Sequence, residues 1–173
     1  MPKARAAPKF TAPPAKTAPA TRVRIVQATP KQAYSLLVLT RAYFPYVKLK
    51  FDELQSRLNE QPRGEHLYLT AKKAGRTIGY SHLAFDSKKP SVRLLGLAVL
   101  EEFRRQGIGE KLLARSLKEA RKRGARTLNL LVSENNSAAL ALYSCHHFEK
   151  RGRLHKPFQN ERILVLSRSL APA

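Results

Sequence analysis

One stretch in the second half of the chain, residues 92–123, most constrains the fold, because strand, turn and helix signals follow one another directly. Residues 92–99 (VRLLGLAV) are nearly all apolar, which is typical of a strand covered on both faces. A turn with two glycines, RRQGIG at 104–109, comes next, and residues 109–123 then repeat apolar side chains at helical spacing up to Gly124. A strand buried on both faces needs helices on both sides of its sheet, so this stretch predicts a layered α/β fold.

The remaining elements extend this pattern into one mixed sheet. Alternating apolar and charged residues near the start predict a first strand, and Thr29-Pro30 has the form of a helix start. We therefore expect a mixed α/β fold with a central twisted sheet flanked by helices. In chain order the expected elements are strand 22–25, helices 31–43 and 51–58, strands 66–71, 77–85 and 92–99, helix 109–123, strand 128–132, helix 137–145 and strands 148–153 and 163–170.

The length of 173 residues fits one domain, which we place at residues 22–171. The segment before it, residues 1–21, is mainly Ala, Pro, Lys and Thr, and its prolines disfavour helices and strands, so we expect a disordered basic tail. The alternatives for this tail are a tether to RNA or another acidic surface and a targeting segment. The single Cys145 excludes an internal disulfide, and no apolar run approaches the roughly 20 residues of a membrane-spanning helix. We expect a cytoplasmic protein without membrane contact.

The charge of the chain is strongly unbalanced. Lys and Arg number 33 and Asp and Glu 12, so the net charge is +21, of which +17 lies outside the tail. Such a field attracts phosphate-bearing partners and repels polyamines, aminoglycosides and histone-like tails. RNA or the ribosome is therefore an expected contact of the tail and of the basic face of helix 109–123, although the same cations also fit a solvated helix face.

The RRQGIG turn has the features of an anion site. A glycine-containing turn that opens a helix aims several free main-chain N–H groups at one point, and the helix dipole adds about half a positive charge there. Gly107 and Gly109 let the main chain approach a ligand, and Arg104 and Arg105 add cations. The pattern best fits phosphate or pyrophosphate, whereas a Walker loop would need Lys where this chain has Glu110. Two glycines before a helix also occur in ordinary turns.

A second motif, about 27 residues further on, helps to interpret the RRQGIG turn. It lies in the short helix after strand 128–132 and consists of Asn136, Ala139, Leu142 and Tyr143. Together, RRQGIG and NSAALALY resemble the GNAT superfamily of acetyl-CoA-dependent N-acetyltransferases, whose first motif has the form Arg/Gln-x-x-Gly-x-Gly/Ala. The motifs cover residues 92–148, and the expected order of strands and helices extends the resemblance to about residues 22–170.

The resemblance implies a role for each of these segments. Strand 92–99 would separate from its neighbour, and the main-chain groups of Leu97, Ala98 and Val99 would hold the acetyl carbonyl and the pantetheine arm. Asn136 would contact the coenzyme, cap its helix, or do both. Tyr143 would donate a proton to the departing thiolate, or pack on the core as an ordinary helix residue. The turn would wrap the pyrophosphate with main-chain amides, and its residues are Arg104, Arg105, Gln106, Gly107, Ile108, Gly109 and Glu110.

Within the superfamily, residues 94–153 look most like the bacterial and archaeal enzymes that acetylate protein N-termini, including the ribosomal-protein alanine acetyltransferases. Those enzymes have a glutamate where this chain has Leu131, and often another acid where it has Arg93. The general base is therefore not carried over by the resemblance. Glu134, at the end of its strand, and His82, on a middle strand beside the cleft, are the candidate bases. The alternatives are turn capping for Glu134 and a structural role for His82.

We expect an N-acetyltransferase that moves an acetyl group from acetyl-CoA to a primary amine by direct attack. A free α-amine with a pKa near 8 is about a tenth neutral at pH 7, and a lysine near 10.4 is almost wholly charged, so a site without a strong base favours α-amines by roughly 3 kcal/mol. The expected acceptor is the α-amine of a protein or peptide, or a small neutral or acidic amine. No metal is expected, because His146 and His147 point in different directions from a helix end. The alternative is a GNAT-fold RNA- or ribosome-associated binding protein with weak or no catalysis.

Overall fold

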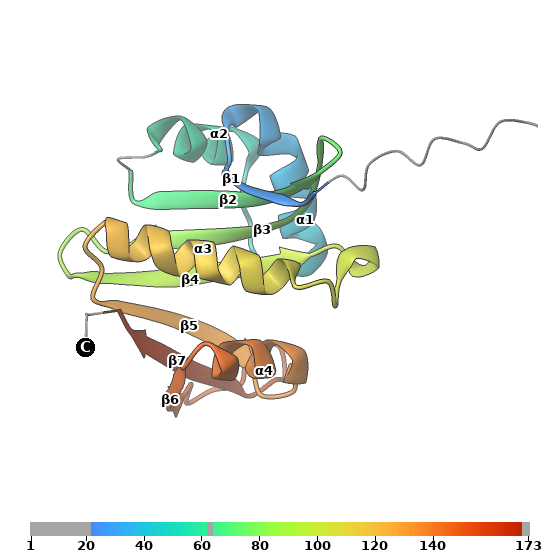
Figure 1. The fold of residues 1–173 in the computed structure, drawn as a ribbon. Coiled ribbons are helices and arrows are strands. Elements are labelled where there is room, and N and C mark those ends of the chain that lie inside the picture. Colours follow the sequence, from blue (N-terminus) through green and yellow to red (C-terminus); the bar gives the residue numbers. More distant parts are fainter. Residues whose placement is uncertain (1–21, 62–63, 171–173) are drawn as a thin grey trace, which may run out of the picture.

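A seven-stranded sheet organises the computed structural model, which describes residues 22–61 and 64–170 (Figure 1). The expected tail, residues 1–21, lies outside the described residues. The strands are β1 (Arg24–Gln27), β2 (His66–Lys73), β3 (Arg76–Phe85), β4 (Ser91–Val99), β5 (Thr127–Ser133), β6 (Glu149–Arg153) and β7 (Ile163–Ser169). They lie in the order β1-β2-β3-β4-β5-β7-β6, and all neighbours are antiparallel except β4 and β5, which run parallel. The sheet is mixed, as predicted.

Helices cover both faces of this sheet, as the apolar pattern of the fourth strand predicts. They are α1 (Ala33–Tyr43), α2 (Phe51–Glu60), α3 (Ile108–Lys122) and α4 (Ser137–Cys145), with short 3₁₀ turns at Pro30–Gln32 and Glu101–Phe103. Figure 1 shows α1 and α2 behind the sheet, where they pack on β2, β3 and β4, and α3 in front of it. None of the helices in the described ranges is long and apolar enough to cross a membrane.

Each face of the sheet buries its own apolar cluster. Alternation along β3 sends Tyr80 toward α1 and Leu83 toward α3, so one strand serves both clusters. Leu112, Leu113 and Leu117 of α3 enter the first cluster, and the first two are fully buried. Full burial of one such leucine contributes roughly 1.5–3 kcal/mol, so the spacing of these residues fixes which side of α3 meets the sheet.

Both ends of α3 are set by glycines with left-handed backbone angles. Gly107 is the N-cap residue at φ 70°, so the helix begins at Ile108, one residue earlier than the sequence predicts. At the other end Gly124 has φ 78°, and the N–H of Ala125 donates to the carbonyl of Ala120. This is a Schellman arrangement, and it confirms that Gly124 ends the helix.

The parallel pairing of β4 with β5 is short. Residues Ser91–Leu94 pair with Thr127–Leu130, and the two strands separate beyond them. The cause lies on the other edge of β4, where the register with β3 shifts between His82 and Leu83 and leaves Leu95 as an extra residue. Such a bulge bends its strand and increases the local twist, so β4 turns away from β5 at Leu95.

Gly79 marks a close approach of β3 to the end of β4. A Cβ built at Gly79 would lie 2.7 Å from the carbonyl oxygen of Ala98, a main-chain atom that moves only if β4 moves. We predict that Gly79→Ala lowers the free energy of unfolding by about 1–3 kcal/mol, the usual cost of overpacking. Gly152→Ala is the control, because a Cβ there meets no atom within 4 Å, and it should change stability by less than about 1 kcal/mol. Urea denaturation measures both, and equal values would contradict this packing.

Candidate functional site

A cleft opens where β4 and β5 stop pairing. Residues 96–99, which include Leu97, Ala98 and Val99, pair only with β3, and residues 131–133 pair only with β7. Figure 1 shows the two strands diverging toward the end at which α3 begins. The main-chain polar groups on the facing edges of these segments therefore have no strand partner. An extended ligand can take the place of the missing strand.

The turn between β4 and α3 presents a row of unpaired main-chain N–H groups. Arg105 and Gly107 have φ angles of 61° and 70°, which turn the chain sharply before α3 begins. The N–H groups of residues 105–110 form no hydrogen bond with any residue that the structure describes. Amides in this arrangement, at the positive end of a 15-residue helix, can hold a phosphate or a diphosphate.

The polar side chains of the turn have different surroundings. Nε of Arg104 donates to the carbonyl oxygen of Val99 at 3.1 Å, and its guanidinium lies 5.3 Å from the centroid of the Tyr43 ring. Arg104 therefore ties the turn to β4 and α1. Gln106 donates to the main chain of the preceding 3₁₀ turn at 3.3 Å. Arg105 is exposed and forms no ion pair with a described residue, so its charge is the more available of the two arginines.

Gly109 brings the motif segments together. A Cβ built there would lie 3.8 Å from Leu97 of β4 and 3.7 Å from Leu142 of α4. Both are ordinary contact distances, so the protein neighbours alone do not require a glycine, and the close approach of a ligand would. On either side, Ile108 is buried in the core and Glu110 is exposed. The start of α3, the open end of β4 and α4 thus meet at one place.

Asn136 caps α4. Its Oδ1 accepts a hydrogen bond from the N–H of Ala139 at 3.1 Å, which confirms the capping role weighed from the sequence. Its contact with a coenzyme stays a prediction. An asparagine can cap through Oδ1 and donate through Nδ2 at the same time, so the two roles remain compatible.

Glu134 lies just beyond the end of β5. Its main-chain N–H donates to the carbonyl oxygen of Arg162 at 2.8 Å, and its side chain is exposed. Ser133 caps the turn here, because its Oγ accepts a hydrogen bond from the N–H of Asn135 at 3.1 Å. The alternative prediction from the sequence, that Glu134 caps this turn, is therefore wrong. The carboxylate of Glu134 makes no hydrogen bond or ion pair with a described residue, so it is available to solvent and to a ligand.

Tyr143 lies on α4 with its ring against Phe148, 5.4 Å between centroids. The residue is 7% exposed, and burial raises the pKa of its hydroxyl to about 12. The hydroxyl has no hydrogen bond to a described residue. It is nevertheless not fully enclosed, because the only fully enclosed side-chain polar atom without a partner in the described ranges is Thr70 Oγ1. The Tyr143 hydroxyl therefore reaches the edge of the core and stays protonated at physiological pH. It can act as a proton donor.

Aromatic side chains wall the opposite face of the sheet beside the cleft. Phe44 and the hydroxyl of Tyr80 lie 3.3 Å from the position of a Cβ on Gly96. Tyr46, after α1, packs edge-to-face on Phe158, in the β6–β7 connection, with 4.8 Å between centroids. Because α1 packs on β3 and β4 while β6 and β7 lie beyond β5, this contact joins the two sides of the cleft. This contact could not be predicted from the sequence, since two aromatics in separate loops share no spacing that would reveal it.

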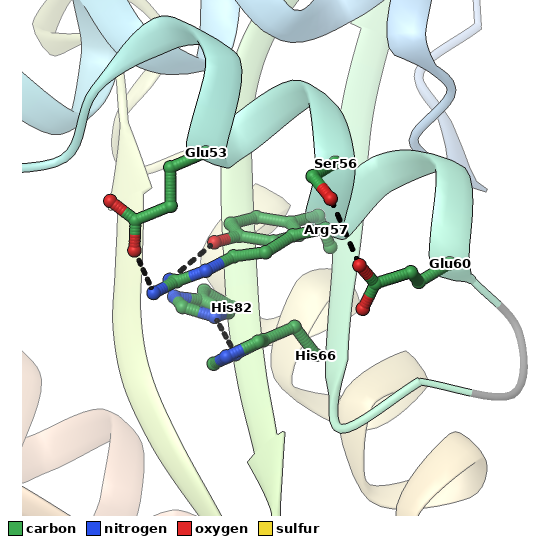
Figure 2. Close-up of polar contacts among 7 residues, drawn as sticks. Glu53, Ser56, Arg57, Glu60, His66 and His82 are labelled. Carbon is green, nitrogen blue, oxygen red and sulfur yellow. Dashed lines mark hydrogen bonds and ion pairs between the residues drawn. The ribbon is translucent and has the colours of Figure 1, made fainter.

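A polar cluster lies under α2 on this same face (Figure 2). His82 Nε2 and His66 Nδ1 are 3.0 Å apart, and the His82 ring stacks on Tyr68 at 4.0 Å. Arg57 of α2 donates to the Tyr68 hydroxyl at 3.4 Å and pairs with Glu53. Burial lowers the pKa of His82 well below its usual value, and His66 and Arg57 lower it further. His82 is therefore neutral and held in a side-chain network, which is the structural role weighed from the sequence.

The two positions at which the resemblance leads us to expect acids lie beside the cleft. Arg93 of β4 is exposed and stands in register with Asn129 of β5, next to the last pair before the strands separate. Leu131 follows on β5 and is 59% exposed. No carboxylate takes their place on these two strands. Among the described residues, no group of three or more His, Cys, Asp and Glu side chains is arranged to hold a metal ion.

Comparison with known proteins matches residues 33–148 to the model of the acetyltransferase (GNAT) family. An acetyltransferase of Yersinia enterocolitica is 30% identical over 97 residues, which are 56% of this chain and 65% of that protein, so the match spans less than two thirds of the relative. A GNAT-family acetyltransferase of Streptococcus pneumoniae has a TM-score of 0.76 at 23% identity, over 87% of this chain and 100% of the other. The ribosomal-protein-S18-alanine N-acetyltransferase of Escherichia coli has a TM-score of 0.71 at 21% identity, over 88% and 96%. These structures share the fold, and the predicted fold class is confirmed.

The neutral state of His82 makes stability depend on pH. Its pKa is lower in the folded protein than in the unfolded chain, so protons bind preferentially to the unfolded chain below about pH 6.5. Stability should be full above that pH and should decline below it, by at most about 1.4 kcal/mol per pH unit for this group. We predict a shallower decline between pH 7 and pH 5 for His82→Gln in urea denaturation. Leu83→Ala removes buried volume but no titratable group and should keep the wild-type slope, and a wild-type slope in His82→Gln would refute this assignment.

Proposed function

The chain belongs to the GNAT family of acetyltransferases, and on that premise we propose that it transfers an acetyl group from acetyl-CoA to the α-amine of a protein or peptide. The observation that carries the proposal is the meeting of three features at one end of the sheet. These are strand edges without a partner, a row of unpaired amides and a protonated tyrosine hydroxyl. Each occurs alone in other proteins, but together they suit the pantetheine, the diphosphate and the leaving thiolate of one coenzyme.

The coenzyme would lie along the open edge of β4. The amides of residues 105–110 would hold its diphosphate, and the exposed Arg105 would add a positive charge. The main-chain groups of residues 97–99 would bond to the amides of the pantetheine arm, as a strand adds to a sheet edge. Asn136 would donate to the same arm through Nδ2.

The chemistry is a direct transfer. The nitrogen of the neutral amine attacks the thioester carbonyl and forms the C–N bond, and the C–S bond breaks when the tetrahedral intermediate collapses. A main-chain N–H at Leu97 would stabilise the oxyanion, and Tyr143 would give its proton to the leaving sulfur and regain one from the ammonium through solvent. Because a hydroxyl with a pKa of about 12 is a weaker acid than a thiol near 8.5, Tyr143 would act mainly by stabilising the developing charge on sulfur.

The proton of the acceptor amine needs an acceptor in its turn. Glu134 is the side chain that we assign to this step, through water, because its carboxylate is exposed at the end of β5 and otherwise unengaged. His82 is a poor choice, since its lowered pKa makes it a weak proton acceptor. A weak and indirect base suits α-amines, which lose their proton more readily than lysine side chains.

A chain end is the acceptor that best fits the far side of the cleft. The contact of Tyr46 with Phe158 encloses the approach to the thioester from that face, so a narrow, extended substrate is favoured over a bulky folded one. The E. coli protein that shares this fold acts, by its name, on an alanine of a ribosomal protein, which is consistent with a protein α-amine.

A second candidate function, contact with RNA or the ribosome, is favoured by cations at the far end of α3. Burial and the neighbouring charge of Arg121 both lower the pKa of the Arg168 guanidinium, so like charges lie close together there. The carboxylate of Glu119 forms its ion pair with Arg115 and not with Arg121 or Arg168. The cluster lies about 20 Å along the helix from the amide row, so a coenzyme diphosphate does not account for it. Further exposed cations near this end are Lys118, Lys122 and Arg126.

Replacing the Tyr143 hydroxyl tests the proposed chemistry. Tyr143→Phe keeps the ring packed on Phe148 and removes only the proton donor, so we predict a fall of about 10²-fold in kcat with little change in stability. Chromatographic measurement of coenzyme A released with a peptide acceptor gives the rate, and it avoids thiol reagents that would react with the exposed Cys145. Phe148→Leu is the control for packing. An unchanged kcat in Tyr143→Phe would remove Tyr143 from the mechanism.

Charge reversal on α3 tests RNA contact. We predict that Lys118→Glu with Arg121→Glu weakens binding of a labelled single-stranded RNA at least tenfold and lowers the slope of log K against log salt by roughly 0.7 for each lost phosphate contact. Lys31→Glu with Arg41→Glu makes the same change in net charge on exposed residues of the other face and should have a smaller effect. Fluorescence anisotropy measures both, and equal effects of the two pairs would mean that no RNA surface exists on α3.

A further inference from the structure

We propose that Arg93 selects acceptors that carry a carboxylate within one residue of the reacting amine. The inference rests on the proposed function, because it concerns the acceptor of that transfer. It deepens the proposal by naming the chemical class of the acceptor, a chain end that is acidic next to its amine.

Arg93 lies beside the point at which β4 and β5 separate. Arg93 stands in register with Asn129, and β4 and β5 separate directly after the next pair, Leu94 with Leu130. Leu94 belongs to the cluster under α3, so alternation along β4 sends Arg93 to the opposite face of the sheet. Residues of α4 pack against the same cluster as α3, so both segments that would hold the coenzyme lie on this one face of the sheet. The acceptor must therefore reach the thioester from the face that carries Arg93.

The charge of Arg93 is not neutralised by any residue that the structure describes. Arg93 is exposed and forms no ion pair with a described residue, whereas Arg57 of α2, on the same face, is paired with Glu53. Arg93 borders a cavity of about 490 Å³, which offers a ligand space beside this residue.

The charged neighbours in this cavity do not change that conclusion. Asp86 uses Oδ1 to accept the N–H groups of Lys88 and Lys89, so it serves its own turn. Lys89 adds a second positive charge to the cavity wall. Glu65 is the remaining acidic residue that lines the cavity, and it forms no ion pair with Arg93.

The length of an arginine side chain matches the distance from an α-amine to a carboxylate on the next residue. A guanidinium binds a carboxylate through two parallel hydrogen bonds, the strongest and most directional pairing available to an anionic group. In an extended peptide each residue adds at most about 3.6 Å, so a carboxylate on the second residue lies roughly 7 Å from the α-amine. An arginine side chain spans a similar length from its strand. An amine at the point of strand separation and a carboxylate on Arg93 can therefore be bound together.

Acceptor peptides that differ only at the second residue test the inference. Ala-Glu, Ala-Gln and Ala-Lys peptides, amidated at the C-terminus, are compared by kcat/KM for wild type, Arg93→Gln and Arg93→Glu. Arg24→Glu, on the exposed edge strand β1, is the matched charge control. An Ala-Ala dipeptide with a free or amidated C-terminus distinguishes a main-chain carboxylate from a side-chain one.

We expect wild type to prefer Glu to Lys at least tenfold, Arg93→Gln to lose most of that preference, and Arg93→Glu to prefer Lys. Arg24→Glu should keep the wild-type ratio. Transfer without a charge preference in wild type, or the same ratio in Arg93→Glu and Arg24→Glu, would overturn the inference and leave the proposed function standing. If Arg93→Glu does not fold, Arg93→Gln decides. Absence of transfer to every peptide would overturn the proposed function, and the inference with it.

Discussion

The unfinished pairing of two central strands is the constraint on which the rest of this structure depends. Leu95 is the extra residue of a bulge, and from it β4 follows β3 while β5 follows β7. Unpaired main-chain groups at such a place cost about 1–3 kcal/mol each when they are shielded from water without a partner. A ligand that supplies the missing hydrogen bonds can therefore bind to the main-chain N–H and C=O groups that have no strand partner.

The two faces of the sheet present different groups at this opening. On the α3 face, glycine-dependent backbone angles expose a row of amides, and α4 brings Tyr143 to the same place. On the α1 and α2 face, aromatic and cationic side chains border the approach of a second substrate. The thioester would sit between them, so coenzyme and acceptor would meet without competing for the same groups.

The geometry of the turn before α3 and of the helix caps could be predicted from the sequence because its determinants are local. Gly107 and Gly124 act through backbone angles of their own turns, and Asn136 caps α4 by accepting from the N–H three residues further on. The opposite face of the sheet could not be predicted, because Tyr46 and Phe158 meet across 112 positions of sequence and the pKa of His82 is lowered by burial and by neighbours on another strand and a helix. The inward bond of Arg104 to Val99 was equally invisible, since an arginine in a turn is usually solvated.

Titration of the ¹⁵N-labelled protein with acetyl-CoA, followed by amide resonances, tests the central claim most directly. We expect the N–H signals of residues 105–110 to shift most, because these six groups gain anionic partners, and those of residues 97–99 to shift with them. Saturating coenzyme that leaves both sets unmoved would show that the cleft does not hold it, and would contradict the account given above.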